Sequence, residues 1–167
     1  MKTRQWQIVL LVIFGWIGFF CFGCSERKEI VPVQAGIMVP QTGIVIDVDY
    51  DPRLDNLVPG YKLLTVAIDN NTLTPFHLDP AKDRWEVQDS RGRWQPALHD
   101  LKSRREALWR KLPNRIREII DYPEVVGVGE TGVFDIFLKS SLTLEGFRGV
   151  RYDSTQIGRI VEVQREP

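Results

Sequence analysis

The apolar positions beyond residue 42 recur mostly with a period of two, which is the spacing of β-strands. Over 44–51, four apolar residues from Ile44 to Tyr50 alternate with Val45 and three aspartates, so one face of the segment is apolar. Gly, Pro or Asn separates most of the segments of this kind. Further strands are predicted at 61–69, 75–78, 84–88, 93–95, 132–138, 146–152 and 158–163. Seven or eight short strands predict a mainly β chain, folded as an antiparallel β-sandwich over residues 42–167.

One segment between these strands has the period of a helix instead. Leu101, Leu108 and Leu112 fall on one helical face, and basic residues cover the remainder of the surface. Asp100 is placed to cap the start of this helix, and Pro113 ends it. We therefore expect one short helical insertion in the sandwich, at about residues 100–120.

The first 23 residues have the pattern of an export signal. Lys2 and Arg4 precede an uncharged, mainly apolar run that ends at Phe22, and the next charged residue is Glu26. A basic end stays in the cytoplasm while the apolar part enters the membrane. A signal or anchor helix is therefore predicted before the sandwich, and the domain is expected outside the cytoplasm.

Cys24 stands where this apolar run stops. Together with Gly23 it resembles the lipobox of bacterial lipoproteins, in which a small residue precedes the lipidated cysteine, although Cys21 and Phe22 depart from that motif. Lipidation of Cys24 is favoured over an uncleaved anchor, which an uncharged run of ~20 residues also allows, and over simple cleavage, which lacks an A-x-A-like site. Residues 1–23 are then the signal peptide and 24–41 a tether. Inner and outer membrane both stay open.

Three motifs further along the chain resemble a group of bacterial lipoproteins. They are a strand that ends in an Asn-containing turn (60–71), a hairpin with a D-x-x-G turn (85–92), and a turn of the P-G-E-T kind that enters a late strand (128–134), with Val128 in place of the proline. The resemblance implies an immunoglobulin-like β-sandwich of unknown function after a lipidated N-terminus. It carries no catalytic residues, and the helix at 101–112 is an insertion relative to it.

Composition narrows the classes of function. The 22 Lys and Arg residues balance 22 Asp and Glu residues, which argues against a nucleic-acid partner, and 43% apolar residues argue against a disordered chain. Neither cysteine lies beyond residue 24, so the exported domain has no disulfide of its own and depends on its core. Residues 101–119 nevertheless hold seven basic residues against two glutamates.

The basic residues of the insertion are the predicted interaction surface. Near an anionic lipid, an envelope polymer or an acidic protein, each basic group contributes ~1 kcal/mol of attraction. The alternative is an ordinary solvated helix face, on which arginine stems cover apolar neighbours. The residues concerned are Lys102, Arg104, Arg105, Arg110, Lys111, Arg115 and Arg117.

Four carboxylates, Asp47, Asp49, Asp51 and Asp55, form a candidate calcium site, because Ca²⁺ takes six to eight oxygen ligands. The segment is not an EF-hand, since Pro52 stands where that loop requires glycine. The alternative is the wet face of an amphipathic strand, whose charges prevent pairing at a sheet edge. No other cofactor is expected.

The remaining candidate residues are better explained by structural roles than by catalysis or metal binding. His77 and His99 are isolated, and the G-x-S-x-G, S-x-x-K and phosphate-loop motifs are absent. Trp85 and Trp94 flank one predicted turn, and we expect them to pair across strands. The expected function is that of a non-enzymatic, membrane-anchored envelope lipoprotein that binds another envelope protein or an anionic envelope polymer. The alternatives are a calcium or small-ligand domain and a hydrolase whose site is assembled only by folding.

Overall fold

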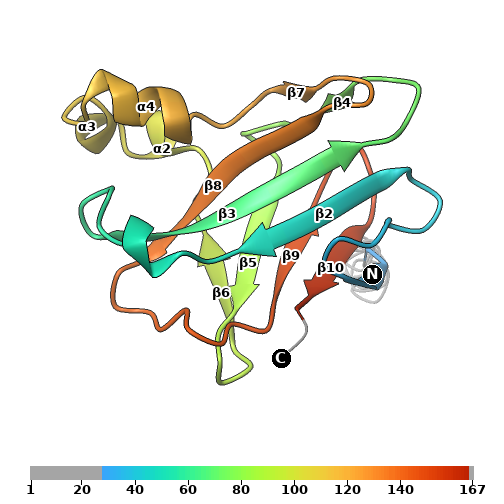
Figure 1. Ribbon diagram of the computed structural model, residues 1–167, viewed down its shortest axis with the longest axis horizontal. Helices are drawn as coiled ribbons and strands as arrows, with labels where there is room; N and C mark the ends of the chain where they lie inside the picture. Colours follow the sequence, from blue (N-terminus) through green and yellow to red (C-terminus); the bar gives the residue numbers. More distant parts are fainter. Residues whose placement is uncertain (1–27, 166–167) are drawn as a thin grey trace, which may run out of the picture.

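The computed structural model describes residues 28–165, which form a mainly β structure with ten strands and three short α-helices. The strands make up a five-stranded, a three-stranded and a two-stranded sheet. Figure 1 shows the two larger sheets lying face to face, with the strands of one crossing those of the other. This arrangement is consistent with the predicted β-sandwich.

The larger sheet has the order β1-β10-β9-β5-β6. Strand β1 runs parallel to its neighbour β10, and the other pairs in this sheet are antiparallel. Pro32 and Pro96 lie inside the two edge strands, where a missing N–H discourages pairing with another chain. The bounds are β1 (Ile30–Gln34), β5 (Arg84–Gln88), β6 (Trp94–Ala97), β9 (Gly149–Asp153) and β10 (Ile160–Gln164).

The three-stranded sheet has the order β2-β3-β8 and is antiparallel throughout. A short 3₁₀ helix, η1 (Pro52–Leu54), lies between its first two strands. The remaining pair of two-residue strands is also antiparallel. The bounds are β2 (Ile44–Asp49), β3 (Tyr61–Asn70), β8 (Thr131–Lys139), β4 (Phe76–His77) and β7 (Val125–Val126).

All eight predicted strand segments contain a strand, and two strands were not predicted. One is β7, and the other is β1, which lies inside the predicted tether 24–41. The tether prediction is wrong from Ile30 onward, because Val31 and Val33 are buried in the core and β1 pairs with β10. The parallel pairing also means that the sandwich is not antiparallel throughout. The signal peptide 1–23 and Cys24 lie outside the described residues.

The main core fills the space between the two larger sheets. Ile46, Val66 and Ile136 enter it from the three-stranded sheet, and Val87 and Val150 face them from the other sheet. Each of these side chains is fully buried, and burying one such side chain contributes about 1.5–3 kcal/mol. Within residues 28–165 no helix has the length and hydrophobicity needed to span a bilayer.

A second, smaller core lies on the outer face of the three-stranded sheet. Because neighbouring residues of a strand face opposite ways, Leu64 joins the main core while Leu63 points outward, opposite Phe137. The helical insertion covers these two residues with Leu101 and Ile120. Its helices are α2 (Leu101–Arg104), α3 (Glu106–Trp109) and α4 (Asn114–Ile120).

The insertion differs from the single helix expected at 101–112. Asp100 caps α2 as predicted, since its carboxylate accepts a hydrogen bond from the Ser103 amide at 3.0 Å. The helix then breaks at Arg105, whose φ of −141° and ψ of 51° are not helical. A further helix, α4, begins after Pro113. In Figure 1 this insertion and the strand pair β1–β10 lie toward opposite ends of the long axis.

The second core gives a test with two leucines as a matched pair. Leu101 is 1% exposed and Leu73 is 95% exposed. We expect Leu101→Ala to lower the free energy of unfolding by about 2–5 kcal/mol, because it leaves a cavity between α2 and the sheet. Leu73→Ala should change it by less than ~0.5 kcal/mol. Urea unfolding followed by tryptophan fluorescence measures both, and equal effects would contradict a docked insertion.

Candidate functional site

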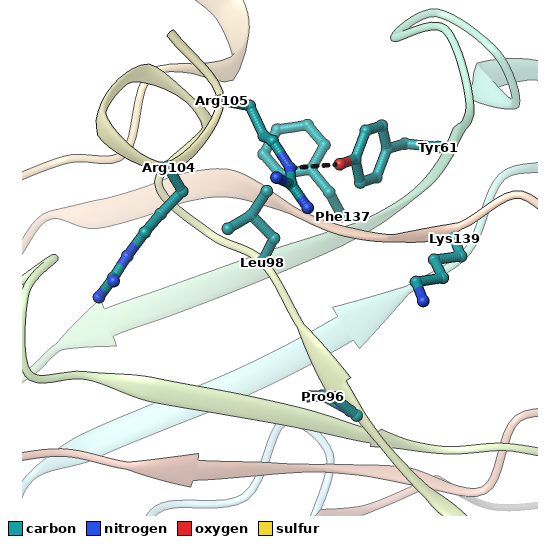
Figure 2. A pocket seen from close by; sticks show the side chains of 7 residues that line it. All are labelled: Tyr61, Pro96, Leu98, Arg104, Arg105, Phe137 and Lys139. Carbon is teal, nitrogen blue, oxygen red and sulfur yellow. Dashed lines mark hydrogen bonds between the residues drawn. The ribbon is translucent and has the colours of Figure 1, made fainter.

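A hollow of about 300 Å³ opens where the helical insertion meets the three-stranded sheet, and we call it the basic pocket. Figure 2 shows Arg105 between Arg104 and Lys139 in this view, above the short segment that joins β6 to the insertion. The lining residues are Tyr61, Pro96, Leu98, Arg104, Arg105, Phe137 and Lys139.

Strand pairing places the sheet residues of the basic pocket. Tyr61 begins β3 and Lys139 ends β8, and the two are partners in the antiparallel register. Leu98, just after β6, is held to Phe137 by two backbone hydrogen bonds of 2.9 and 2.6 Å. The wall of the pocket is therefore part of the hydrogen-bonded sheet framework, which keeps side chains on it well positioned.

The insertion contributes the two arginines. Arg105 occupies the break between α2 and α3, and its Nε donates a hydrogen bond of 3.2 Å to the Tyr61 hydroxyl (Figure 2). The Tyr61 ring in turn packs edge-on against Phe137, with ring centroids 6.2 Å apart. Arg105 is thus held by one nitrogen, and its two terminal Nη groups make no hydrogen bond to any described residue.

The three cations of the basic pocket have no neutralising partner among residues 28–165. No described carboxylate lies within 4.0 Å of Arg104, Arg105 or Lys139, and no acidic residue lines the hollow. Like charges at one hollow repel one another, and their fields add at the point that an incoming anion would occupy. This arrangement favours the binding of an anionic group.

The other five basic residues of the predicted surface lie outside the basic pocket. Arg110 pairs with Glu106, and Lys102 lies 3.9 Å from Asp121. Lys102 and Arg117 line a separate hollow of about 280 Å³, whose wall also contains two acidic residues, Glu118 and Asp121. Lys111 and Arg115 are exposed elsewhere on the insertion. Of the seven predicted residues, the basic pocket therefore contains only Arg104 and Arg105.

Sequence reasoning missed Tyr61 and Lys139. They are 78 positions apart, and only the register of β3 against β8 makes them neighbours. The one signal in the sequence is that Lys139 ends a strand pattern and Tyr61 begins one. Antiparallel partners of this kind meet at the same edge, but the sequence does not say which strands pair.

A larger hollow of about 950 Å³ lies elsewhere, against the ends of the five-stranded sheet, and contains Arg148 and Arg165. One of these two cations is already engaged, because Arg165 lies 3.4 Å from a carboxylate oxygen of Asp49 and stacks over the Phe147 ring at 4.8 Å. Arg148 has no described carboxylate within 4.0 Å. The basic pocket is smaller, but it has three such cations. We therefore treat the basic pocket as the candidate site.

The four aspartates of the predicted calcium site are not brought together. Among the described residues no group of three or more acidic, histidine or cysteine side chains is placed to hold a metal ion. Asp51 is paired with Arg53 at 2.7 Å, and Asp55 with Lys62 at 3.2 Å. The guanidinium of Arg53 holds the pKa of Asp51 below its usual range.

Asp47 and Asp49 have other partners. A carboxylate oxygen of Asp47 accepts a 2.9 Å hydrogen bond from the amide of Val48 on β2, an edge strand, and Asp49 faces Arg165 as described above. Occupying an edge amide and placing charge along the edge both discourage pairing with a second chain. The structure thus agrees with the alternative of a solvated, protected strand.

A buried network of Asp83, Trp85, Tyr122 and Tyr152 connects the insertion to the main core. Asp83 Oδ2 accepts hydrogen bonds from the Tyr122 and Tyr152 hydroxyls, both at 3.0 Å. The Tyr122 hydroxyl also accepts one of 3.2 Å from the Trp85 indole nitrogen. Tyr122 comes two residues after α4, so the network fixes where the insertion returns to the sandwich.

The predicted pairing of Trp85 with Trp94 is wrong. In the register of β5 and β6, Trp85 lies opposite Ala97, and Trp94 lies opposite Gln88. Trp85 points into the core and stacks on Tyr152, with ring centroids 4.0 Å apart. Trp94 is half-buried on the other face, where the Arg151 guanidinium lies 3.9 Å from its ring centroid. Trp94 lies three positions before Ala97, the partner of Trp85, and an odd offset along a strand places the two tryptophans on opposite faces of the sheet.

His99 packs against this network. Its ring lies 4.7 Å from that of Tyr122, and its Nε2 lies 3.1 Å from the carbonyl oxygen of Pro80, so Nε2 carries the proton. Burial lowers the pKa of His99, while burial raises the pKa of Asp83 and of Tyr122. His99 is 7% exposed and His77 is exposed on β4, and neither lines the basic pocket.

The lowered pKa of His99 makes stability depend on pH. Buried His99 stays neutral at pH values where the same histidine takes up a proton in the unfolded chain. The contribution of neutral His99 to stability is therefore complete above about pH 6.5 and is lost as the pH falls below that value. We expect the free energy of unfolding to fall between about pH 7.5 and about pH 5.5. Measured by urea unfolding, this fall in the free energy of unfolding should be smaller for His99→Gln than for the unaltered chain. For His77→Gln it should equal that of the unaltered chain.

Comparing the two histidine variants also distinguishes the effect of His99 on the pH dependence of stability from the effects of neighbouring charged groups. Asp83 acts with the opposite sign, because stability is lost as the pH rises through its raised pKa, and Asp100 and Arg104 act on the His99 ring as well. These groups are retained in both histidine variants. Equal slopes for His99→Gln and the unaltered chain would contradict the assignment.

Comparison with protein-family models, with curated proteins and with solved structures finds no match for this chain.

Proposed function

We propose that this chain is a lipoprotein of the bacterial cell envelope, anchored by a lipid on Cys24, which acts without catalysis as a binding or accessory module. The basic pocket, where the helical insertion meets the three-stranded sheet, forms the binding surface. The partner presents an anionic group to that surface, either on an envelope polymer or on another envelope protein.

The observation that carries the proposal is the set of three unneutralised cations at one hollow. Elsewhere on the insertion Arg110 is matched by Glu106, as on an ordinary solvated helix. Arg104, Arg105 and Lys139 instead line one hollow, from the insertion and from a strand, with no described carboxylate within 4.0 Å. Leaving such charges unpaired costs stability through mutual repulsion, so their presence together supports a role in binding.

The position of the pocket supports a partner other than the anchoring membrane. Ile30, the first residue of β1, comes six residues after Cys24, and six extended residues span roughly 22 Å at most. Lipidation of Cys24 would therefore hold the β1 end of the domain close to the bilayer. The insertion lies toward the opposite end of the long axis (Figure 1), so the basic pocket would face away from that membrane.

The strand order supports an immunoglobulin-like assignment of the sandwich. In that fold, strands A, B and E share one sheet with D, and strands C, F and G share the other. Here β2, β3 and β8 take the places of A, B and E, while β5, β9 and β10 take those of C, F and G. The helical insertion stands between β6 and β8, where strand D would run.

The binding role is tested by capture of the full-length protein from chemically cross-linked envelopes. We expect replacement of Arg104, Arg105 and Lys139 by glutamine to reduce the captured partner by about tenfold or more, because each lost charged contact costs ~1 kcal/mol. The matched control replaces Arg110, Lys111 and Arg115, which removes the same charge outside the basic pocket. Equal loss in the two triple variants would refute a specific role for the pocket.

The anchor is tested by labelling with a radioactive fatty acid and separating membranes. The label should be absent from Cys24→Ala and retained by Cys21→Ala, because only the residue that becomes the mature N-terminus carries the lipid. A Cys24→Ala protein of unchanged length and full membrane retention would instead indicate an uncleaved anchor.

A further inference from the structure

We infer that the basic pocket binds a phosphate monoester whose organic group is small and has an apolar face. This inference rests on the proposed function and deepens it, because it names the ligand chemistry of the same pocket. It depends on the charge of the pocket, on the way in which Arg105 is held, and on the apolar side chains beside the cations.

The charge of the pocket matches a dianion better than a single carboxylate. Three cations line the hollow, and no acidic residue does. A phosphate monoester carries about −1.5 to −2 charges at neutral pH and offers three strong acceptor oxygens. One carboxylate would leave most of the positive charge unneutralised. A dianion with several acceptors therefore satisfies more of the donors at once.

The geometry of Arg105 provides a fixed fork of donors. The bond from Nε to the Tyr61 hydroxyl holds the guanidinium in place, and the Nη groups stay unused among the described residues (Figure 2). Two parallel N–H donors match two oxygens of a phosphate group, and such bidentate pairs are among the strongest hydrogen bonds in proteins. Because the Tyr61 oxygen already accepts from Arg105, its own proton is left to donate to the ligand.

Lys139 and Arg104 complete the set from two other positions. Lys139 projects from the end of β8, beside the start of β3, and Arg104 projects from the end of α2 with its guanidinium directed away from Arg105 (Figure 2). A lysine acts on phosphate as a compact point charge with three donors, so its exact orientation matters less than that of Arg105. The site therefore combines one directional contact, made by Arg105, with the longer-range attraction of two further charges.

The apolar residues of the lining determine which organic group, esterified to the phosphate, fits the pocket. Pro96 is exposed, Leu98 and the ring of Tyr61 are half-buried, and all three line the same hollow as the cations. A volume of about 300 Å³ lies at the lower limit of small-ligand sites. The pocket thus accommodates one phosphate with a small apolar or aromatic group, and an ester should bind more tightly than inorganic phosphate.

The test uses full-length protein in a non-ionic detergent, titrated by calorimetry at low ionic strength with phenyl phosphate, inorganic phosphate and benzoate. We expect phenyl phosphate to bind about tenfold more tightly than benzoate, since it adds charge-assisted hydrogen bonds. Its affinity should also exceed that of inorganic phosphate. Arg105→Lys keeps the charge but removes the fork, and should weaken phenyl phosphate by about tenfold.

Lys139→Gln should weaken binding several-fold through loss of one charge, and Lys111→Gln, outside the basic pocket, should leave it unchanged. Arg105 and Lys139 are both exposed, so neither substitution removes a buried contact. Absence of phenyl phosphate binding, or equal affinity for benzoate, overturns the inference. Equal affinity for inorganic phosphate overturns the apolar part of it.

Failure of this inference and failure of the proposed function are distinguishable. If phenyl phosphate does not bind but the pocket variant still loses its captured partner, the binding role stands and the ligand chemistry is wrong. If the capture is also unaffected by the pocket variant, the proposed function fails with it.

Discussion

The attachment of the helical insertion to the sandwich depends on one buried carboxylate. Asp83 is 1% exposed, and its Oδ2 accepts from two tyrosine hydroxyls and from the Asp79 amide. A buried carboxylate without donors costs several kcal/mol, so the folded state requires Tyr122 and Tyr152 to converge on it. Tyr152 belongs to β9, whereas Tyr122 follows α4. Asp83 therefore fixes the point at which the insertion returns to the main core, and the insertion has little freedom to shift on the sheet.

This attachment determines what the basic insertion can do. A helix that carries seven basic residues would attract anions over its whole surface if it were mobile, with little specificity. Here the short helices are packed on Leu63 and Phe137, so Arg105 meets Tyr61 at one defined point. Charges separated by more than about 8 Å are screened at physiological ionic strength. The cations that line the basic pocket therefore matter more for binding there than the total charge of the segment does.

How well the sequence predicts each element depends on how far the responsible interactions reach. Strands such as β2 and β3 alternate apolar and polar residues along their own length, and the segments predicted for them were confirmed. The strand β1 was missed because Pro32 interrupts a five-residue pattern whose pairing partner lies about 130 positions away. The break at Arg105 was missed as well, since leucines at 101, 108 and 112 fit one continuous helix as well as two short ones.

The sequence alone determined the periodicity of the strands, the cap at Asp100, the concentration of basic residues in the insertion and the absence of cysteine beyond residue 24. These properties reside in single residues or in neighbours along the chain. Only the tertiary structure decided which basic residues share a pocket, that Lys139 joins two of them, and that the four aspartates do not assemble. The physical reason is that strand register and the Asp83 network set distances between residues far apart in the chain, and no local pattern encodes those distances.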